Sequence, residues 1–214
     1  MEVYQTEEQQ VDAIKGYWKE NGSMIITGLV VGLAGYVGFN FYKDSQFAEE
    51  VARSEAYQVV MEKSDKEADF TQAGETFIAE NAKTSYAALT ALSLAKESAS
   101  HQDWAQTATY LTTAIENAPN DGIKAIASVR LARVQIQLSE FDKALATLNN
   151  PLPESFTSSV EETKGDAYLK QGKTDLARSA YQAALAVEGE AANPVLQMKL
   201  DDLAQAVNLP GDAK

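Results

Sequence analysis

Residues 165–185 read GDAYLKQGKTDLARSAYQAAL, in which small and aromatic residues recur at fixed spacing around a central glycine. Counting from Gly165, tyrosines follow at +3 (Tyr168) and +16 (Tyr181), and a small residue follows at +12 (Ala177). Small residues at +0 and +12 allow two antiparallel helices to cross closely, large ones fill the space beside them, and a glycine at +7 suits the turn between them. The stretch therefore predicts a helical hairpin.

The same frame recurs three times upstream with weaker residues. Its four starting positions are Met61, Ala95, Ala132 and Gly165, at spacings of 34, 37 and 33 residues. The +16 position of the first three units is held by Phe77, Leu111 and Leu148. A period near 34 is that of the tetratricopeptide repeat, which this spacing resembles. The frame predicts an all-α fold whose core is an α-solenoid of about four degenerate hairpins, the first being the most degenerate.

The sequence also predicts where the helices end. Proline and glycine mark breaks at residues 118–122 and 149–153. Ser158 with Glu161 has the spacing of a capping box, and Asn193-Pro194 reads as an N-cap followed by the first helical residue. The last stretch has one apolar face, as expected of a capping helix that closes a solenoid. That face is formed by Leu196, Leu200, Leu203 and Val207.

A different kind of segment lies upstream of the repeats. Residues 21–42, NGSMIITGLVVGLAGYVGFNFY, carry no charge and would span roughly 33 Å as a helix, against about 30 Å of bilayer hydrocarbon. A cleaved signal peptide is the rival interpretation. It would need a basic leader, but residues 1–20 hold five acids and two lysines, and no small-x-small cleavage site follows. We therefore predict an uncleaved transmembrane helix, with residues 1–20 before it and a repeat domain at 43–214.

Two features of this membrane region are candidate contact sites. Tyr17 and Trp18 end a short amphipathic helix before the span, where aromatic residues suit the headgroup layer. This helix is either a simple interfacial anchor or a docking helix. Gly28, Gly32 and Gly35 share one face of the span, and such a stripe lets another membrane helix approach closely. Because glycine is common in spans, the stripe is also compatible with no partner.

Lysine and arginine flank the span about equally, so charge does not orient it. The size of the two sides favours a short N-terminus in the cytoplasm and the large domain outside, because large domains translocate largely regardless of charge.

The composition argues against catalysis and nucleic-acid binding. There is no cysteine and one histidine, His101, so neither a zinc site nor a histidine-based triad can be assembled. Phosphate-binding glycine motifs are absent, and no cofactor is expected. The net charge of −13 repels nucleic acid. The chain is expected not to be an enzyme.

Solenoids usually bind ligands on the concave face, which the first helix of each unit lines. Lys96, Arg133 and Asp166 hold the same position in three units, and Gln137 and Lys170 lie four residues after the last two. These five side chains are the predicted protein-binding residues. The alternative is an ordinary solvated helix face.

The whole chain resembles the YfgM-type ancillary subunit of the bacterial SecYEG translocon. The stretches that carry this resemblance are AIKGYWKENG before the span, SYAALTALSLAK at 85–96, RLARVQIQL at 130–138 and KGDAYLKQGK at 164–173.

The resemblance implies a single-pass protein of the bacterial inner membrane, with its N-terminus in the cytoplasm and its repeats in the periplasm. It implies association with the SecYEG translocon and with a PpiD-like periplasmic chaperone, to which newly exported chains would be passed. It also implies a cytoplasmic role toward a response regulator. Two other classes stay open: a membrane-anchored adaptor for another envelope machine, such as cell-wall synthesis or division, and an enzyme with an unrecognised site.

Overall fold

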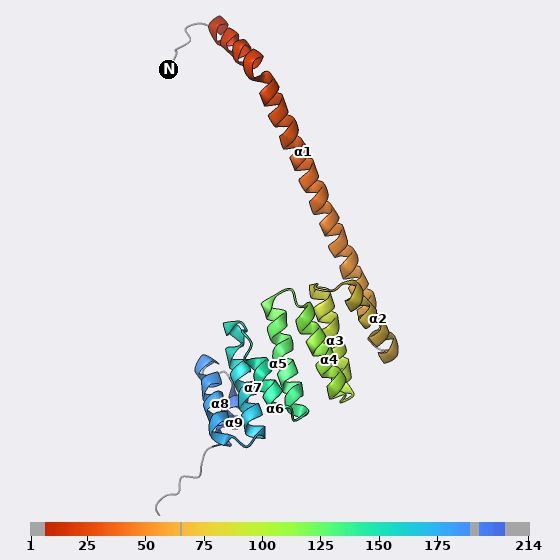
Figure 1. Ribbon diagram of the computed structural model, residues 1–214, viewed down its shortest axis with the longest axis vertical. Helices are drawn as coiled ribbons and strands as arrows, with labels where there is room; N and C mark the ends of the chain where they lie inside the picture. The colour runs from red at the N-terminus through yellow and green to blue at the C-terminus, as the bar shows by residue number, and fades with distance from the viewer. Residues whose placement is uncertain (1–6, 65, 189–192, 204–214) are drawn as a thin grey trace, which may run out of the picture. The chain divides into compact units, whose positions relative to one another are not determined.

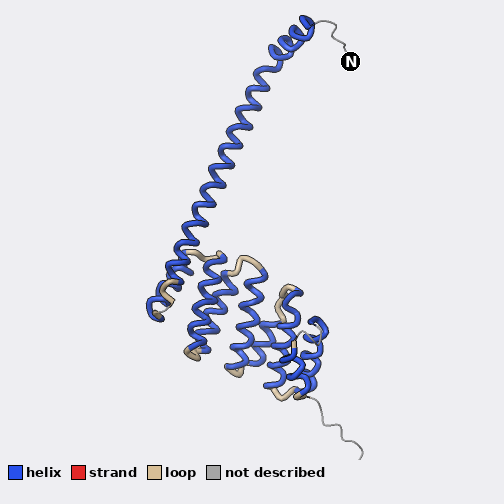
Figure 2. The backbone as a smooth tube through the Cα atoms, turned by 180° about the vertical axis from the view of Figure 1, so that it is seen from behind, coloured by secondary structure: helices blue, strands red, loops and turns tan. Residues whose placement is uncertain are grey.

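The computed structural model describes residues 7–64, 66–188 and 193–203, and every regular element in these ranges is helical (Figure 2). The elements are α1 (Glu7–Met61), α2 (Glu67–Glu80), α3 (Ser85–Ser100), α4 (Trp104–Asn117), α5 (Asp121–Gln137), α6 (Phe141–Leu148), the 3-10 helix η1 (Glu154–Phe156), α7 (Thr157–Lys170), α8 (Thr174–Glu188) and α9 (Pro194–Asp201). The chain divides into two compact units, Met1–Ala52 and Arg53–Lys214. The predicted all-α fold is confirmed.

The first unit consists of the N-terminal part of α1. Among the described residues, α1 is the one helix long and apolar enough to cross a membrane, and its apolar window is fully exposed. Large apolar side chains that an aqueous protein would bury, such as Leu29, Val31 and Phe39, are more than half exposed. A bilayer would supply the apolar surroundings that the chain itself does not.

The second unit is a stack of antiparallel helical hairpins (Figure 1). The pairs are α3 with α4, α5 with α6, and α7 with α8, and each pair packs on the next. The end of α1 takes the place of the first helix of the first hairpin: the ring of Tyr57 lies 6.3 Å from that of Phe77 on α2, and Val60 shares a core cluster with Phe70 and Phe77. The ring of Tyr57 also lies 5.3 Å from that of Tyr86 on α3. The four predicted hairpins are thus confirmed, including the degenerate first one.

The repeat frame falls where the hairpins cross. Ala132 and Ala144 are both fully buried at the crossing of α5 and α6. In the last unit, a Cβ added to Gly165 would overlap the ring of Tyr181, which is itself fully buried. Gly172 adopts φ +75°, the left-handed conformation that glycine reaches without strain, and so turns the chain from α7 into α8.

Both predicted breaks are confirmed, since α4 ends at Asn117 and α6 at Leu148. The capping prediction at Ser158 is wrong. A 3-10 turn after Pro153 leads directly into α7, so Ser158 lies inside the helix and is buried there. The prediction at Asn193 is confirmed, because its side-chain oxygen accepts a hydrogen bond from the Leu196 amide at 3.0 Å and Pro194 follows at the start of α9.

Helix α9 closes the stack as the predicted capping helix. Leu196 is fully buried and Leu203 nearly so, in a cluster that includes Tyr181, Ala184 and Leu185 of α8. The fourth residue of the predicted apolar face, Val207, lies outside the described residues. The end of the solenoid therefore does not expose the apolar face of α8.

Candidate functional site

A groove crosses the first helices of three hairpins. Its volume is about 550 Å³, and its walls come from the end of α1 and from α3, α4 and α5. Helix α5 contacts both α3 and α7, so the first helices of successive hairpins lie next to one another. The groove is lined by Tyr57, Leu89, Leu92, Ser93, Ala95, Lys96, Ala99, Thr107, Leu111, Ile126, Arg130, Arg133 and Val134.

The groove combines an apolar floor with apolar side chains that reach solvent. Leu92 and Leu111 are buried beneath it and belong to the largest core cluster. Leu89 and Ile126, at 37% exposure each, stand at its surface. Isolated exposed apolar residues are ordinary, but here two of them, on α3 and α5, line one hollow. The hollow is therefore suited to take in apolar side chains of a ligand.

Every charged residue that lines this groove is basic: Lys96, Arg130 and Arg133. All three are exposed. Within the ranges that the structure describes, no carboxylate lies within the 4.0 Å ion-pairing distance of any of them. Arg133 donates one hydrogen bond, from Nε to the Thr163 hydroxyl at 3.4 Å. The guanidinium and ammonium groups are thus available to an external anion.

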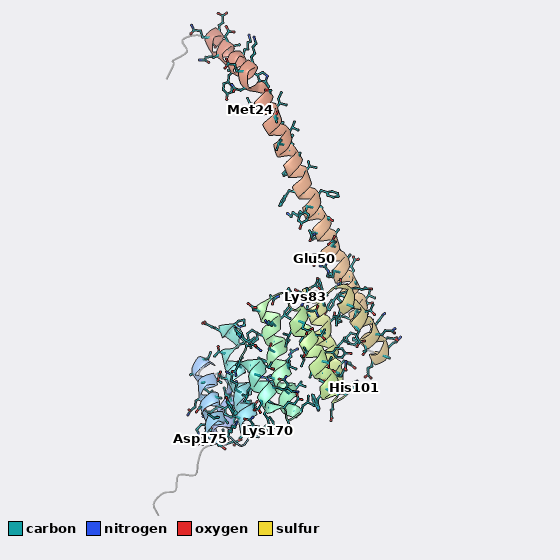
Figure 3. All side chains as sticks on the ribbon, in the orientation of Figure 1. Met24, Glu50, Lys83, His101, Lys170 and Asp175 are labelled. Atoms are coloured by element: carbon teal, nitrogen blue, oxygen red, sulfur yellow. The ribbon has the colours of Figure 1, made fainter. Side chains whose placement is uncertain are left out.

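The structure brings together two of the five predicted binding residues, Lys96 and Arg133. Gln137 and Lys170 are exposed, but neither lines the groove. Figure 3 shows Lys170 close to the turn between α7 and α8. Sequence reasoning missed Arg130, although it precedes Arg133 by three residues and so lies on the same helix face one turn earlier.

Asp166 makes contacts within the chain instead. Its carboxylate accepts hydrogen bonds from Lys199 Nζ at 2.8 and 2.9 Å and from the Tyr181 hydroxyl at 2.7 Å. Lys199 also pairs with Glu162 at 2.8 Å, and its ammonium lies 5.7 Å from the centre of the Tyr181 ring. This network of Glu162, Asp166, Tyr181 and Lys199, the cap network, ties α9 to α7 and α8.

The cap network changes two proton affinities. Burial raises the pKa of the Tyr181 phenol, and its hydrogen bond to Asp166 acts in the same direction. For Lys199, burial lowers the pKa, but the hydrogen bonds to Asp166 and Glu162 outweigh it, so the pKa is raised above its usual value. Both raised pKa values mean that the site stabilises the neutral phenol of Tyr181 and the charged ammonium of Lys199, as expected of a contact that holds helices together.

The one histidine lies on another surface. His101 follows α3 directly (Figure 3). Its Nε2 lies 3.2 Å from a carboxylate oxygen of Glu97 and 3.5 Å from one of Glu67. Among the described residues, no group of three histidine, aspartate or glutamate side chains is arranged to hold a metal ion. His101 therefore makes a surface hydrogen bond with Glu97.

In the first unit, the glycine stripe faces open space. A Cβ added at Gly28, Gly32 or Gly35 would meet no atom within 4 Å. Tyr17 and Trp18 are more than half exposed. The contacts predicted for these five residues, with a membrane helix or with the headgroup layer, stay predictions.

Known proteins are similar to this chain over nearly its whole length. The tetratricopeptide repeat-like domain family matches residues 15–205. An ancillary SecYEG translocon subunit of Escherichia coli K12 is 33% identical over 205 residues, which cover 95% of this chain and 99% of that relative. The proteins of the same name from Haemophilus influenzae and Neisseria gonorrhoeae are 30% and 28% identical, over 92% and 95% of this chain and 97% and 100% of their own. No solved structure matches.

Proposed function

Because the chain belongs to the family of ancillary SecYEG translocon subunits with a tetratricopeptide repeat-like domain, we propose that it is a non-catalytic scaffold at the translocon of the bacterial inner membrane. The observation that supports this most directly is the extent of the similarity. Many unrelated proteins contain tetratricopeptide repeats, and a match to the repeats alone would leave the partner open. Here the relatives match the apolar segment and the repeats together.

The proposal includes an orientation. The segment before the span lies in the cytoplasm, the span crosses the inner membrane, and the repeat domain lies in the periplasm. In this arrangement the repeats meet exported chains as they leave the channel and pass them to a membrane-anchored, PpiD-like chaperone. The cytoplasmic segment is the part of the chain that a soluble response regulator could reach.

Crosslinking in native membranes tests the partner. A photoreactive amino acid is placed at exposed positions of the repeat domain and of the span, and the crosslinked proteins are identified by mass spectrometry. We expect a subunit of the Sec channel among the products, together with a periplasmic chaperone. Crosslinks to cell-wall or division proteins alone would instead establish the adaptor for another envelope machine. Turnover of a substrate by the purified protein would show that the chain is an enzyme.

Protease protection tests the orientation. Protease added outside spheroplasts is expected to digest the repeat domain while the cytoplasmic segment stays protected. The control is a known periplasmic domain in the same spheroplasts. Cleavage of that control with an intact repeat domain would reverse the proposed topology.

A further inference from the structure

We propose that the groove bounded by Lys96, Arg130 and Arg133 is a receptor for a short acidic peptide segment in which carboxylates alternate with apolar side chains. This inference deepens the proposed function, on which it rests for the cellular setting, by naming the chemistry of the segment that the repeat domain takes from a partner. The groove itself is a property of this chain's residues.

The first argument is the sorting of charge. The chain has 31 acidic and 18 basic residues, so a groove with charged lining residues would be expected to contain more carboxylates than cations. This groove has three cations and no carboxylate. In the described parts of the chain none of the three is neutralised by an ion pair, a property they share with other exposed lysines such as Lys66 and Lys173, so the distinguishing feature is the absence of a lining carboxylate. The groove is therefore complementary to an anion that the chain does not supply.

The second argument is the apolar surface between the cations. On α5, Ile126, Arg130 and Arg133 recur at i, i+4 and i+7, so an apolar and two cationic side chains share one helix face. Across the hollow, α3 contributes Leu89 and Lys96, again at i and i+7. A ligand that only carried charge would leave Leu89 and Ile126 unused. A segment with acidic and apolar side chains matches both kinds of surface.

The third argument concerns the class of ligand. A volume of about 550 Å³ accommodates a few side chains, within the range of about 300–1,000 Å³ typical of small binding sites. Lipid-binding surfaces usually gather four to eight basic residues. Here only three are present, on a chain whose net charge of −13 repels an anionic membrane. The observations therefore favour a peptide over a lipid headgroup.

Fluorescence anisotropy with the full chain in neutral detergent tests the proposal. The probe is a short fluorescein-labelled peptide in which Glu alternates with Leu. Two comparison peptides replace every Glu with Lys or every Leu with Ser. We expect the Glu–Leu peptide to bind most tightly, and its affinity to fall as ionic strength rises. Equal binding of the Lys–Leu peptide would overturn the proposal.

Matched variants place the binding site. Replacing Lys96, Arg130 and Arg133 together with Gln should weaken binding of the Glu–Leu peptide by about tenfold or more, because three exposed ion pairs are lost. The control carries the same change of charge at exposed lysines outside the groove, through Lys66→Gln, Lys143→Gln and Lys173→Gln. It should bind like the parent. Equal loss in both triple variants would mean that only net charge matters, and no loss in either would place the peptide elsewhere. Either result would refute the groove as the peptide-binding site.

A second pair of variants tests the apolar half of the site. Leu89→Ser with Ile126→Ser removes two side chains that are 37% exposed, so the melting temperature should fall while the helical circular dichroism well below it is retained, and binding is measured there. Binding should weaken several-fold. Unchanged affinity would show that the contact is purely electrostatic and would refute the alternating ligand.

Two further outcomes separate the alternatives. Displacement of the peptide by monomeric dihexanoyl phosphatidylglycerol, but not by the phosphatidylcholine analogue, would assign the groove to a lipid headgroup and overturn the peptide. Co-purification of the parent chain with SecYEG is measured separately. Its failure with peptide binding intact would refute the proposed function alone, and the reverse result would refute the groove alone.

Discussion

Replacing Gly165 with Ala tests the closest helix crossing in the structure. A Cβ at this position of α7 would overlap the ring of Tyr181 on α8. Tyr181 cannot move freely, because it is fully buried and donates a hydrogen bond to Asp166 at 2.7 Å. Overpacking of this kind usually costs about 1–3 kcal/mol. The higher helix propensity of Ala returns up to about 1 kcal/mol. Because the overlap is with a buried, hydrogen-bonded ring, the cost should lie at the upper end, about 2–3 kcal/mol, and subtracting about 1 kcal/mol leaves a net loss of about 1–2 kcal/mol.

The assay is thermal unfolding of the full chain in detergent, followed by helical circular dichroism. For a domain of this size a loss of 1–2 kcal/mol lowers the melting temperature by roughly 2–8 °C. Gly74→Ala in α2 is the matched control, since its Cβ would lie 3.0–3.2 Å from Cδ1, Cδ2 and Cγ of Leu94, a tight contact without the overlap found at Gly165. Gly74→Ala should lower the melting temperature less than Gly165→Ala does.

A double-mutant cycle makes the test specific to the Gly165–Tyr181 contact. In a Tyr181→Leu background the ring is gone, so Gly165→Ala should become neutral or stabilising through helix propensity alone. The same loss in both backgrounds would show that the cost does not come from the ring. An unchanged or raised melting temperature for the single variant would refute the close crossing itself.

Three further results are expected. Folding raises the pKa values of Tyr181 and Lys199, so these two residues stabilise the fold fully at pH values below their unfolded pKa values, near 10, and less as the pH rises above 10. The free energy of unfolding, measured as a function of pH, should show this loss. In Tyr181→Phe the loss should be smaller. Replacing Gly28 and Gly32 with Leu should leave insertion intact but reduce co-purification with membrane partners, and unchanged recovery would show that the glycines are passive. Residues 45–214 expressed alone should be soluble and almost wholly helical, and substantial sheet by circular dichroism would contradict this.

The hairpins could be predicted from sequence because their determinants are local. A small residue at +0 and another at +12 fix where two helices cross, and the distance between them is set by the helix rise and a short turn. Gly165 and Ala177 therefore mark one crossing, and Ala132 and Ala144 another. The incorrect capping prediction at Ser158 also has a local cause. The 3-10 turn after Pro153 runs directly into α7, so the helix begins before Ser158, the residue with the best capping spacing.

The site was only partly predictable, because the repeat frame assumes that equivalent positions face equivalent surroundings. This holds for Lys96 and Arg133, which lie one residue after the frame start in two internal units. It fails for Asp166 at the same position of the last unit, where α9 covers the surface and Lys199 neutralises the carboxylate. In the last unit of a solenoid, the surface that binds ligand in internal units can instead be covered by the capping helix. The period of the sequence does not encode that change of neighbour.

The separation of charge gives the repeat domain two kinds of selectivity at different ranges. Its excess of acidic residues repels extended polyanions, such as nucleic acid, before they make contact. At physiological ionic strength this field is screened beyond about 8 Å, so a short segment that reaches the groove responds mainly to the nearest charges. Those charges are Lys96, Arg130 and Arg133, with no carboxylate among the residues lining the groove. In the proposed binding mode, a brief acidic stretch on a flexible chain therefore binds where a continuous polyanion does not.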